Sequence, residues 1–280
     1  MNAPRHGLHP RQKARQALER IVAQPSPVPA GATAQVGTFA LRTLLRLRRE
    51  PEQLFDILVT PVMFVVIFTY LFGGALAGSP AAYLQFLLPG ILVQTMVFTT
   101  IHTGVNLNTD LSKGVYDRFR SMPLWAPAPI VGAMLGDTLR YTIAAVIVFA
   151  IGFVMGFRAE GGLSGLLLSV LLLNLFAFGL GWIFIAMALV IRTPATLMNM
   201  SWLLVMPVTF ASNIYVHADT MPPWLSAIVA VNPVTLLVTA LRTVLQDGTA
   251  PLEIALALIA PLALTVVGAP LVMRLYRRER

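Results

Sequence analysis

Two oppositely charged residues, Asp137 and Arg140, lie three positions apart inside an apolar run that extends from residue 130 to residue 156. At this spacing two side chains share one face of a helix, so the carboxylate and the guanidinium can pair. Unpaired in lipid, each charge would cost about 2.5 to 3.5 kcal/mol. The spacing predicts an intramembrane ion pair, which is either a structural salt bridge or a gate that exchanges partners during a transport cycle.

A polar stripe runs along an earlier apolar segment. Positions i, i+4, i+7 and i+11 align on one side of a helix, and here they are occupied by Thr95, Thr99, His102 and Asn106. Such a stripe should face away from lipid. It indicates either the wall of a translocation pathway or hydrogen bonding that holds neighbouring helices together.

A later segment repeats this spacing with a Met and aromatic face, formed by Trp202, Met206, Thr209 and Asn213. Methionine and aromatic side chains can adapt to varied apolar ligands. We therefore consider this face a second candidate lining of a pathway, with ordinary core packing as the alternative.

Signs of metal, nucleotide or hydrolytic chemistry are missing from the sequence. A P-loop requires a lysine after a glycine-rich run, and the only lysines are Lys13 and Lys113, neither in such a context. The chain has no cysteine, and its histidines are scattered: His6, His9, His102 and His217. We expect a protein that is not an enzyme and that binds no metal or cofactor itself.

The elements that position these residues follow from composition. Of 280 residues, 57% are apolar and 11% are charged, whereas soluble domains carry about 25% charged residues. The apolar residues gather in runs of about 20, the length that a helix needs to cross ~30 Å of hydrocarbon. These runs do not show the alternation of apolar and polar residues that a barrel strand has. The sequence predicts an all-α membrane protein.

Six spans fit the sequence best, at about residues 54–73, 84–107, 130–156, 163–191, 195–216 and 252–273. The run 224–245 is long enough for a seventh, but Asn232 and Pro233 divide it and Arg242 would lie in lipid, so we predict two short re-entrant or interfacial helices there. Six spans leave both termini and most Lys and Arg residues in the cytoplasm, as the positive-inside rule requires.

The amino-terminal part is polar and basic. Residues 1–34 predict a disordered cytoplasmic tail before a membrane domain at 35–280. Between 36 and 50, apolar and arginine side chains separate onto two sides of a helix. This amphipathic helix is predicted to lie on the inner leaflet, in contact with lipid headgroups; a solvated helix face is the alternative.

The stretch "KGVYDRFRSMPLWAPAP", residues 113–129, interrupts the apolar runs on the cytoplasmic side. Asn108 or Asp110 could cap a short helix from Gly114 to Met122, which prolines would end. Its aromatic and basic side chains are typical of a docking surface. A connecting loop made basic by the topology rule would look similar.

Three stretches, "GVYDRFRSMPLWAPAP", "GDTLR" and "NPVTLLVTALR", resemble the membrane subunits of ABC transporters, and most of all type-2 permeases of the daunorubicin/doxorubicin-resistance group. The resemblance covers about residues 36–275. It implies the ABC type-2 permease fold and a coupling helix that docks on an ATPase subunit. The matching positions are Gly114, Tyr116, Asp117, Arg118, Phe119, Arg120 and Pro123.

The resemblance also implies a function and partners. The chain would be the permease of an exporter in the cytoplasmic membrane that moves drugs or lipids, with ATP and Mg used by two copies of a separate ATPase. A second permease chain, identical or paralogous, would complete the pathway, and no nucleic acid is involved. Alternatives are export of polysaccharide or complex lipid, a proton-coupled carrier that uses Asp137, Arg140 and His102, and a membrane scaffold without transport.

Overall fold

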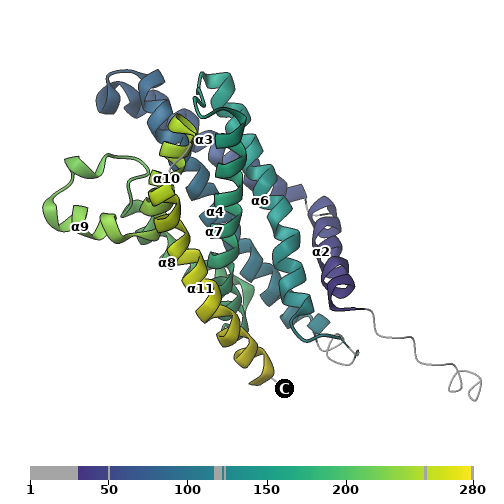
Figure 1. Cartoon of the computed structure of the whole chain (residues 1–280). Coiled ribbons are helices and arrows are strands. Elements are labelled where there is room, and N and C mark those ends of the chain that lie inside the picture. Colours follow the sequence, from purple (N-terminus) through teal and green to yellow (C-terminus); the bar gives the residue numbers. More distant parts are fainter. Residues whose placement is uncertain (1–30, 50, 117–121, 123, 249–250, 279–280) are drawn as a thin grey trace, which may run out of the picture. The chain divides into compact units, whose positions relative to one another are not determined.

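Helices make up the regular secondary structure of the described part of the chain (Figure 1). The computed structural model describes residues 31–49, 51–116, 122, 124–248 and 251–278, with the side chains of 47–58 and 278 left aside. The predicted all-α class is confirmed. In chain order the elements are α2 (Ala32–Arg49), α3 (Pro51–Ala77), α4 (Pro80–Ser112), α6 (Ala128–Met155), α7 (Gly162–Val190), α8 (Pro194–Phe210), the 3-10 turn η1 (Ala218–Thr220), α9 (Pro223–Val231), α10 (Pro233–Asp247) and α11 (Pro251–Arg278).

The long helix α4 lies at the centre of the bundle. In its most apolar stretch 83% of the residues are buried, against 11% in the corresponding stretch of α11. Helix α4 contacts α3, α6, α7, α8 and α10. The helix starts with Pro80 in its first turn, and the Ser79 side chain accepts a hydrogen bond from the Ala82 amide. Polar side chains on α4 therefore meet other helices rather than lipid.

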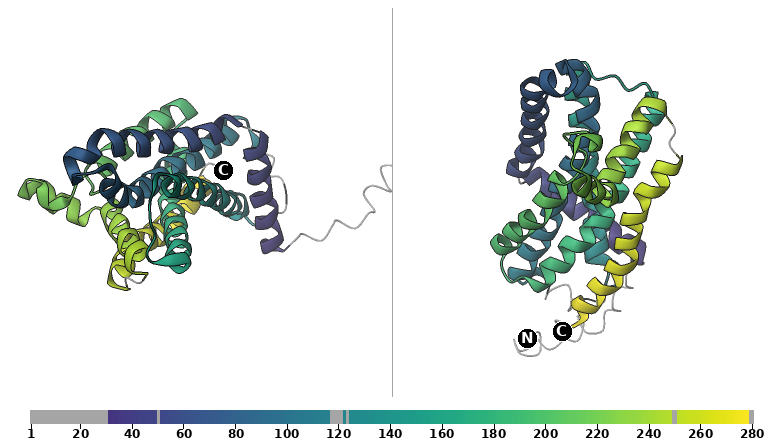
Figure 2. Two further views of the ribbon diagram at one scale, coloured as in Figure 1. Left: turned by 90° about the horizontal axis from the view of Figure 1, so that it is seen from above. Right: turned by 90° about the vertical axis from the view of Figure 1, so that its left-hand side faces the viewer.

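Helix α2 packs closely against the first half of α6, as Figures 1 and 2 show for the purple and teal helices. Two glycines of α6 permit this approach. A Cβ at Gly132 would lie 2.5 Å from Cβ of Phe39, and one at Gly136 would lie 2.6 Å from Cβ of Thr43. Helix α2 begins at Ala32, four residues before the predicted start, and ends at Arg49.

Among the described residues, five helices are long and apolar enough to cross a membrane, at Val59–Ala77, Pro80–Ser112, Ala128–Met155, Gly162–Val190 and Pro251–Arg277. They correspond to five of the six predicted spans. The remaining prediction, 195–216, is too long, because α8 has 17 residues and ends at Phe210. The Asn232 side chain binds the carbonyls of Val208 and Ala211, at 2.7 and 2.6 Å, and so holds the end of α8.

The run 224–245 is divided where the sequence predicted. Helices α9 and α10 meet at Asn232 with a bend of 77°, so the pair is either one broken span or a re-entrant loop. Asn232 makes this break stable because its side-chain oxygen accepts a hydrogen bond from the Val234 amide, at 2.9 Å. The same side chain thus caps α10 and closes α8.

Candidate functional site

A cavity of about 280 Å³ lies among α3, α4 and α8. Its wall is mainly apolar and aromatic, with a few polar groups, which is the usual character of a small-molecule site. In this wall the Phe98 and Trp202 rings pack edge to face, with centroids 4.8 Å apart. The lining residues are Thr60, Pro61, Phe64, Ile91, Gln94, Thr95, Phe98, Thr99, Ile101, His102, Met198 and Trp202.

Three residues of the predicted α4 stripe, Thr95, Thr99 and His102, line this cavity together with Trp202 of α8. The fourth, Asn106, lies one turn further and lines a second cavity of about 40 Å³ nearer the carboxyl-terminal end of α4. The periodicity therefore identified a shared face, but that face serves two separate cavities.

The remaining residues of the predicted α8 face do not line the cavity. Met206 is exposed on the outside of the helix, whereas Thr209 is fully buried. Asn213 follows the end of α8, and its amide donates to the Thr239 hydroxyl of α10 at 3.1 Å. The predicted face assumed a helix that continues to Asn213, but α8 ends at Phe210. Asn213 therefore does not share a helical face with Trp202.

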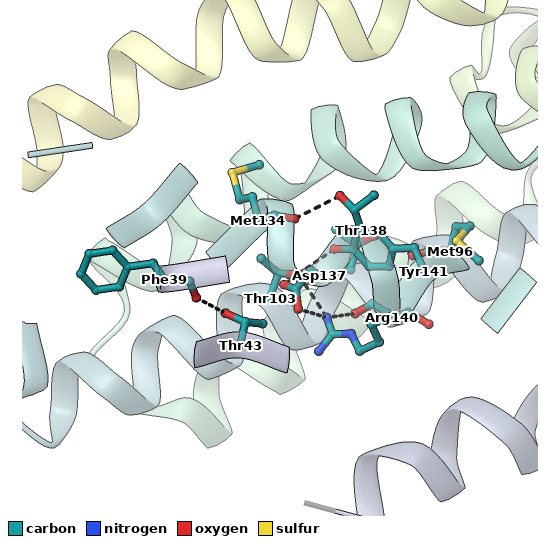
Figure 3. Close-up of polar contacts among 11 residues, drawn as sticks. Phe39, Thr43, Met96, Thr103, Met134, Asp137, Thr138, Arg140 and Tyr141 are labelled. Carbon is teal, nitrogen blue, oxygen red and sulfur yellow. Dashed lines mark hydrogen bonds and ion pairs between the residues drawn. The ribbon is translucent and has the colours of Figure 1, made fainter. Parts of the chain in front are cut away.

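Asp137 and Arg140 of α6 form the predicted ion pair (Figure 3). Their closest oxygen and nitrogen are 3.3 Å apart, and each side chain is only 4% exposed. Arg140 also donates to the Thr99 backbone carbonyl at 3.1 Å and lies over the Tyr141 ring, 5.6 Å from its centroid. Thr99 lines the cavity of about 280 Å³ among α3, α4 and α8, which is called the main cavity below. The ion pair is therefore connected to the wall of the main cavity.

The hydroxyl of Thr103 joins the members of this cluster (Figure 3). It donates its single hydrogen to Asp137 Oδ2, at 2.6 Å. A hydroxyl has two acceptor positions left, and these receive Arg140 at 3.2 Å and the Tyr141 phenol at 2.7 Å. Tyr141 must then be the donor to Thr103. One α4 hydroxyl thus links both charges of α6.

A second charged cluster lies at the carboxyl-terminal end of α4. Arg42 and Arg46 of α2 both bind the Asp110 carboxylate, at 2.9 and 3.2 Å. The prediction that Asn108 or Asp110 caps a separate helix is wrong, because α4 continues to Ser112. Asn108 instead donates to the Ala188 and Ile191 carbonyls at the end of α7.

The predicted coupling residues fall at the edge of the described chain. Gly114 lies two residues after the end of α4 and has a φ of +68°, a conformation that suits glycine. Tyr116 is buried and meets Tyr276 of α11 edge to face at 6.1 Å. Burial raises the pKa of the Tyr116 phenol, which stays protonated. The other members lie outside the described residues, and the coupling role stays a prediction for them: Asp117, Arg118, Phe119, Arg120 and Pro123.

Sequence reasoning placed Arg242 in a short re-entrant or interfacial helix but did not identify its contacts. Its guanidinium donates to the carbonyls of Phe86, Asn213 and Ile214, at 3.0, 2.8 and 3.2 Å. It also lies 3.6 Å from the centroid of the Phe86 ring, a cation–π contact. Backbone acceptors leave no trace in side-chain patterns, so only the structure reveals this clamp.

Gln94 and Tyr215 were also missed. The Tyr215 phenol donates to the Gln94 side-chain oxygen at 2.7 Å, and Gln94 lines the main cavity. Gln94 lies beside Thr95 in the sequence and off the four-residue stripe, so periodicity could not select it. Among the described residues, no group of three or more acidic or histidine side chains could hold a metal ion.

Several helices of membrane-spanning length, with a mostly apolar cavity among them, define a multi-pass helical membrane protein. The chain belongs to the ABC-2 type transporter family, whose family model matches residues 34–245. The resemblance seen in the sequence is therefore confirmed. Since the family match spans α2 to α10, it includes both cavities and both charged clusters.

Several relatives are transport proteins by name. The chain is 42% identical, over 93% of each chain, to the daunorubicin resistance ABC transporter permease protein DrrB1 of Streptomyces coeruleorubidus. It is 27% identical to the putative transport permease ycf38 of Cyanophora paradoxa, over 72% of this chain and 70% of that one. It is 20% identical to the probable doxorubicin resistance permease protein DrrC of Mycobacterium tuberculosis, over 74% and 75%.

Proposed function

We propose that this chain is the permease subunit of an ATP-driven exporter that moves hydrophobic or amphipathic molecules out across the cytoplasmic membrane. The observation that carries the proposal is the match of the ABC-2 type transporter family to residues 34–245. A separate ATPase, present in two copies, binds ATP and Mg, since the sequence has no P-loop. Two permease chains, identical or paralogous, form the pathway, and both termini lie in the cytoplasm.

The packing of α2 supports a mechanical route from an ATPase to the cavity. Its arginines bind Asp110 at the end of α4, and its Phe39 packs on Gly132 near the start of α6. These two helices flank the segment that contains Phe119 and Arg120. A displacement of that segment would therefore act on α4 and α6 together, with α2 keeping them in register.

The cavity supports a hydrophobic or amphipathic substrate. Its aromatic and apolar wall suits drugs or lipid-like molecules, and the daunorubicin resistance permease in the same family is named for drug resistance. Polysaccharide export would favour a ladder of aromatic residues, and Trp202 is the one tryptophan in the cavity wall. We therefore favour drug or lipid export over polysaccharide export.

Co-purification in mild detergent tests the proposal. We expect an ATPase to purify with the permease, and we expect ATP-dependent efflux from cells that carry both subunits. Changing Phe119 and Arg120 to alanine should leave membrane insertion intact and uncouple ATP hydrolysis from export. Normal export by this double variant would remove the coupling role from the segment. Export that survives ATP depletion and stops when the proton gradient collapses would favour a proton-coupled carrier.

A further inference from the structure

We propose that Gln94 selects the ligand of the main cavity by donating hydrogen bonds to a carbonyl of an uncharged, planar aromatic molecule. Tyr215 is the residue that positions the side-chain amide of Gln94. The inference rests on the proposed function, because it takes the cavity among α3, α4 and α8 as part of the export pathway. It adds a chemical rule for what the cavity accepts.

The orientation of the Gln94 amide follows from its one hydrogen-bond partner. Gln94 is 2% exposed, and its oxygen accepts a hydrogen bond from the Tyr215 phenol at 2.7 Å. A buried phenol needs an acceptor. Among the described residues, the Tyr215 hydroxyl donates to the Gln94 oxygen and to no other acceptor. If the Gln94 amide were flipped, its nitrogen would face this hydroxyl, and the hydroxyl would have no acceptor.

The amide nitrogen of Gln94 is therefore the end that faces the cavity. Within the described chain it makes no hydrogen bond, although the side chain is almost completely buried. Two N–H donors are available there to a ligand. The neighbouring Thr95 hydroxyl cannot substitute for them, because its hydrogen is donated to the Ile91 carbonyl at 2.7 Å.

Tyr215 is itself held on several sides. Its ring stacks on Phe68 and Phe210, with centroids 4.8 and 5.3 Å away. Its backbone carbonyl accepts a hydrogen bond from the Tyr83 phenol at 2.8 Å. A phenol fixed in this way can hold the amide in one orientation before a ligand arrives, which reduces the ordering cost of binding.

The rest of the wall defines the remainder of the ligand. The rings of Phe64, Phe98 and Trp202 offer aromatic surface, and planar aromatic molecules stack favourably on such rings. No Asp, Glu, Lys or Arg occurs among the described residues that line the cavity. A charged group buried there would be poorly compensated, so the wall favours an uncharged ligand with a hydrogen-bond acceptor.

A pair of probes isolates the hydrogen bond. 9-Fluorenone and fluorene share a planar skeleton, and only the former has a carbonyl. We would measure equilibrium binding of both to the full chain in lipid nanodiscs and subtract uptake by nanodiscs without protein. One hydrogen bond predicts that fluorenone binds about three- to tenfold more tightly than fluorene.

Substitutions at the two residues should change this preference. Gln94→Leu and Gln94→Met both remove the donors at a similar side-chain size, so in either variant the ratio should fall to about one. Tyr215→Phe should lower the ratio about two- to threefold, because the amide is freed to rotate. Tyr70→Phe, which removes an exposed phenol from α3, is the matched control and should leave the ratio unchanged.

The outcomes distinguish this inference from the proposed function. If both Gln94 variants bind the probes and keep the wild-type ratio, Gln94 is not the selecting residue, while ATP-dependent export stands. A Tyr215→Phe ratio equal to wild type would remove the positioning role. If neither probe binds the wild-type chain above the lipid background, the cavity is not a site for such ligands, whether or not the chain exports others.

Discussion

Two arginines of the described chain, the buried Arg140 and the partly buried Arg242, are held in different ways. Arg140 lies beside a carboxylate, Asp137, and both charges meet the hydroxyl of Thr103. Arg242 binds three backbone carbonyls and the face of Phe86, and no carboxylate pairs with it among the described residues. The first arginine is neutralised by an opposite charge, and the second is solvated by peptide dipoles.

This difference indicates different roles. An ion pair between side chains can be removed as a unit, and its partners can be exchanged during a conformational change. The Arg242 guanidinium instead binds backbone carbonyls of α4 and of the 213–214 segment, and so connects the backbones of these two segments. We therefore expect the Asp137–Arg140 cluster to tolerate a paired replacement and the Arg242 clamp to tolerate none.

The largest expected effect comes from breaking the ion pair. Asp137→Asn leaves the Arg140 charge buried without its counter-charge, which should cost about 3 to 5 kcal/mol in free energy of unfolding. Adding Arg140→Gln removes the orphaned charge and should recover much of this loss. SDS-titration unfolding in mixed micelles measures both, and strictly additive losses in the double-mutant cycle would show that the residues do not pair.

The clamp should respond next most strongly. Arg242→Met keeps an aliphatic contact with Phe86 but leaves the three carbonyls without their donor, which should cost about 2 to 3 kcal/mol. Arg242→Lys should recover only part of it, because an ammonium lacks the planar fork of a guanidinium. The same unfolding measurement applies, and full recovery by lysine would reduce the clamp to a simple charge effect.

The hydroxyl that links both charges of α6 provides a smaller and more selective test. Thr103→Val preserves shape but removes one donor and two acceptor positions, and it should cost about 1 to 2 kcal/mol. Thr103→Ser keeps the hydroxyl and serves as the control. A valine variant as stable as the serine variant would show that the network contributes no net stability.

The cluster of Arg42, Arg46 and Asp110 should give the smallest effect. Arg42 is 43% exposed where it binds Asp110, and exposed pairs contribute about 0.2 to 1 kcal/mol. Asp110→Asn should therefore destabilise the chain slightly, and the difference should shrink as salt is raised. A larger, salt-independent loss would place this cluster with the buried ones.

Much of this arrangement could be predicted because it depends on helical periodicity. Asp137 and Arg140 meet since they are three residues apart on one helix, and Thr95, Thr99 and His102 share a face for a similar reason. The break at Asn232 was visible because Asn and Pro together end and restart helices.

The rest depends on contacts between distant segments. The end of α8 is decided by Asn232, 22 residues beyond Phe210, so the predicted span ran too far and Asn213 was misplaced. Gln94 acquires its role through Tyr215, and Arg242 through carbonyls, and neither relation has a local sequence signal. Helical faces are local, whereas their partners are set by the packing of the whole bundle.

Reconstitution tests the central claim most directly, namely that this chain moves its cargo only when a separate ATPase drives it. Vesicles that contain the permease alone should accumulate no hydrophobic cargo against a gradient, with or without ATP or a proton gradient. Vesicles that also contain the co-purified ATPase should accumulate it when ATP is added. Uphill transport by the permease alone would contradict the account.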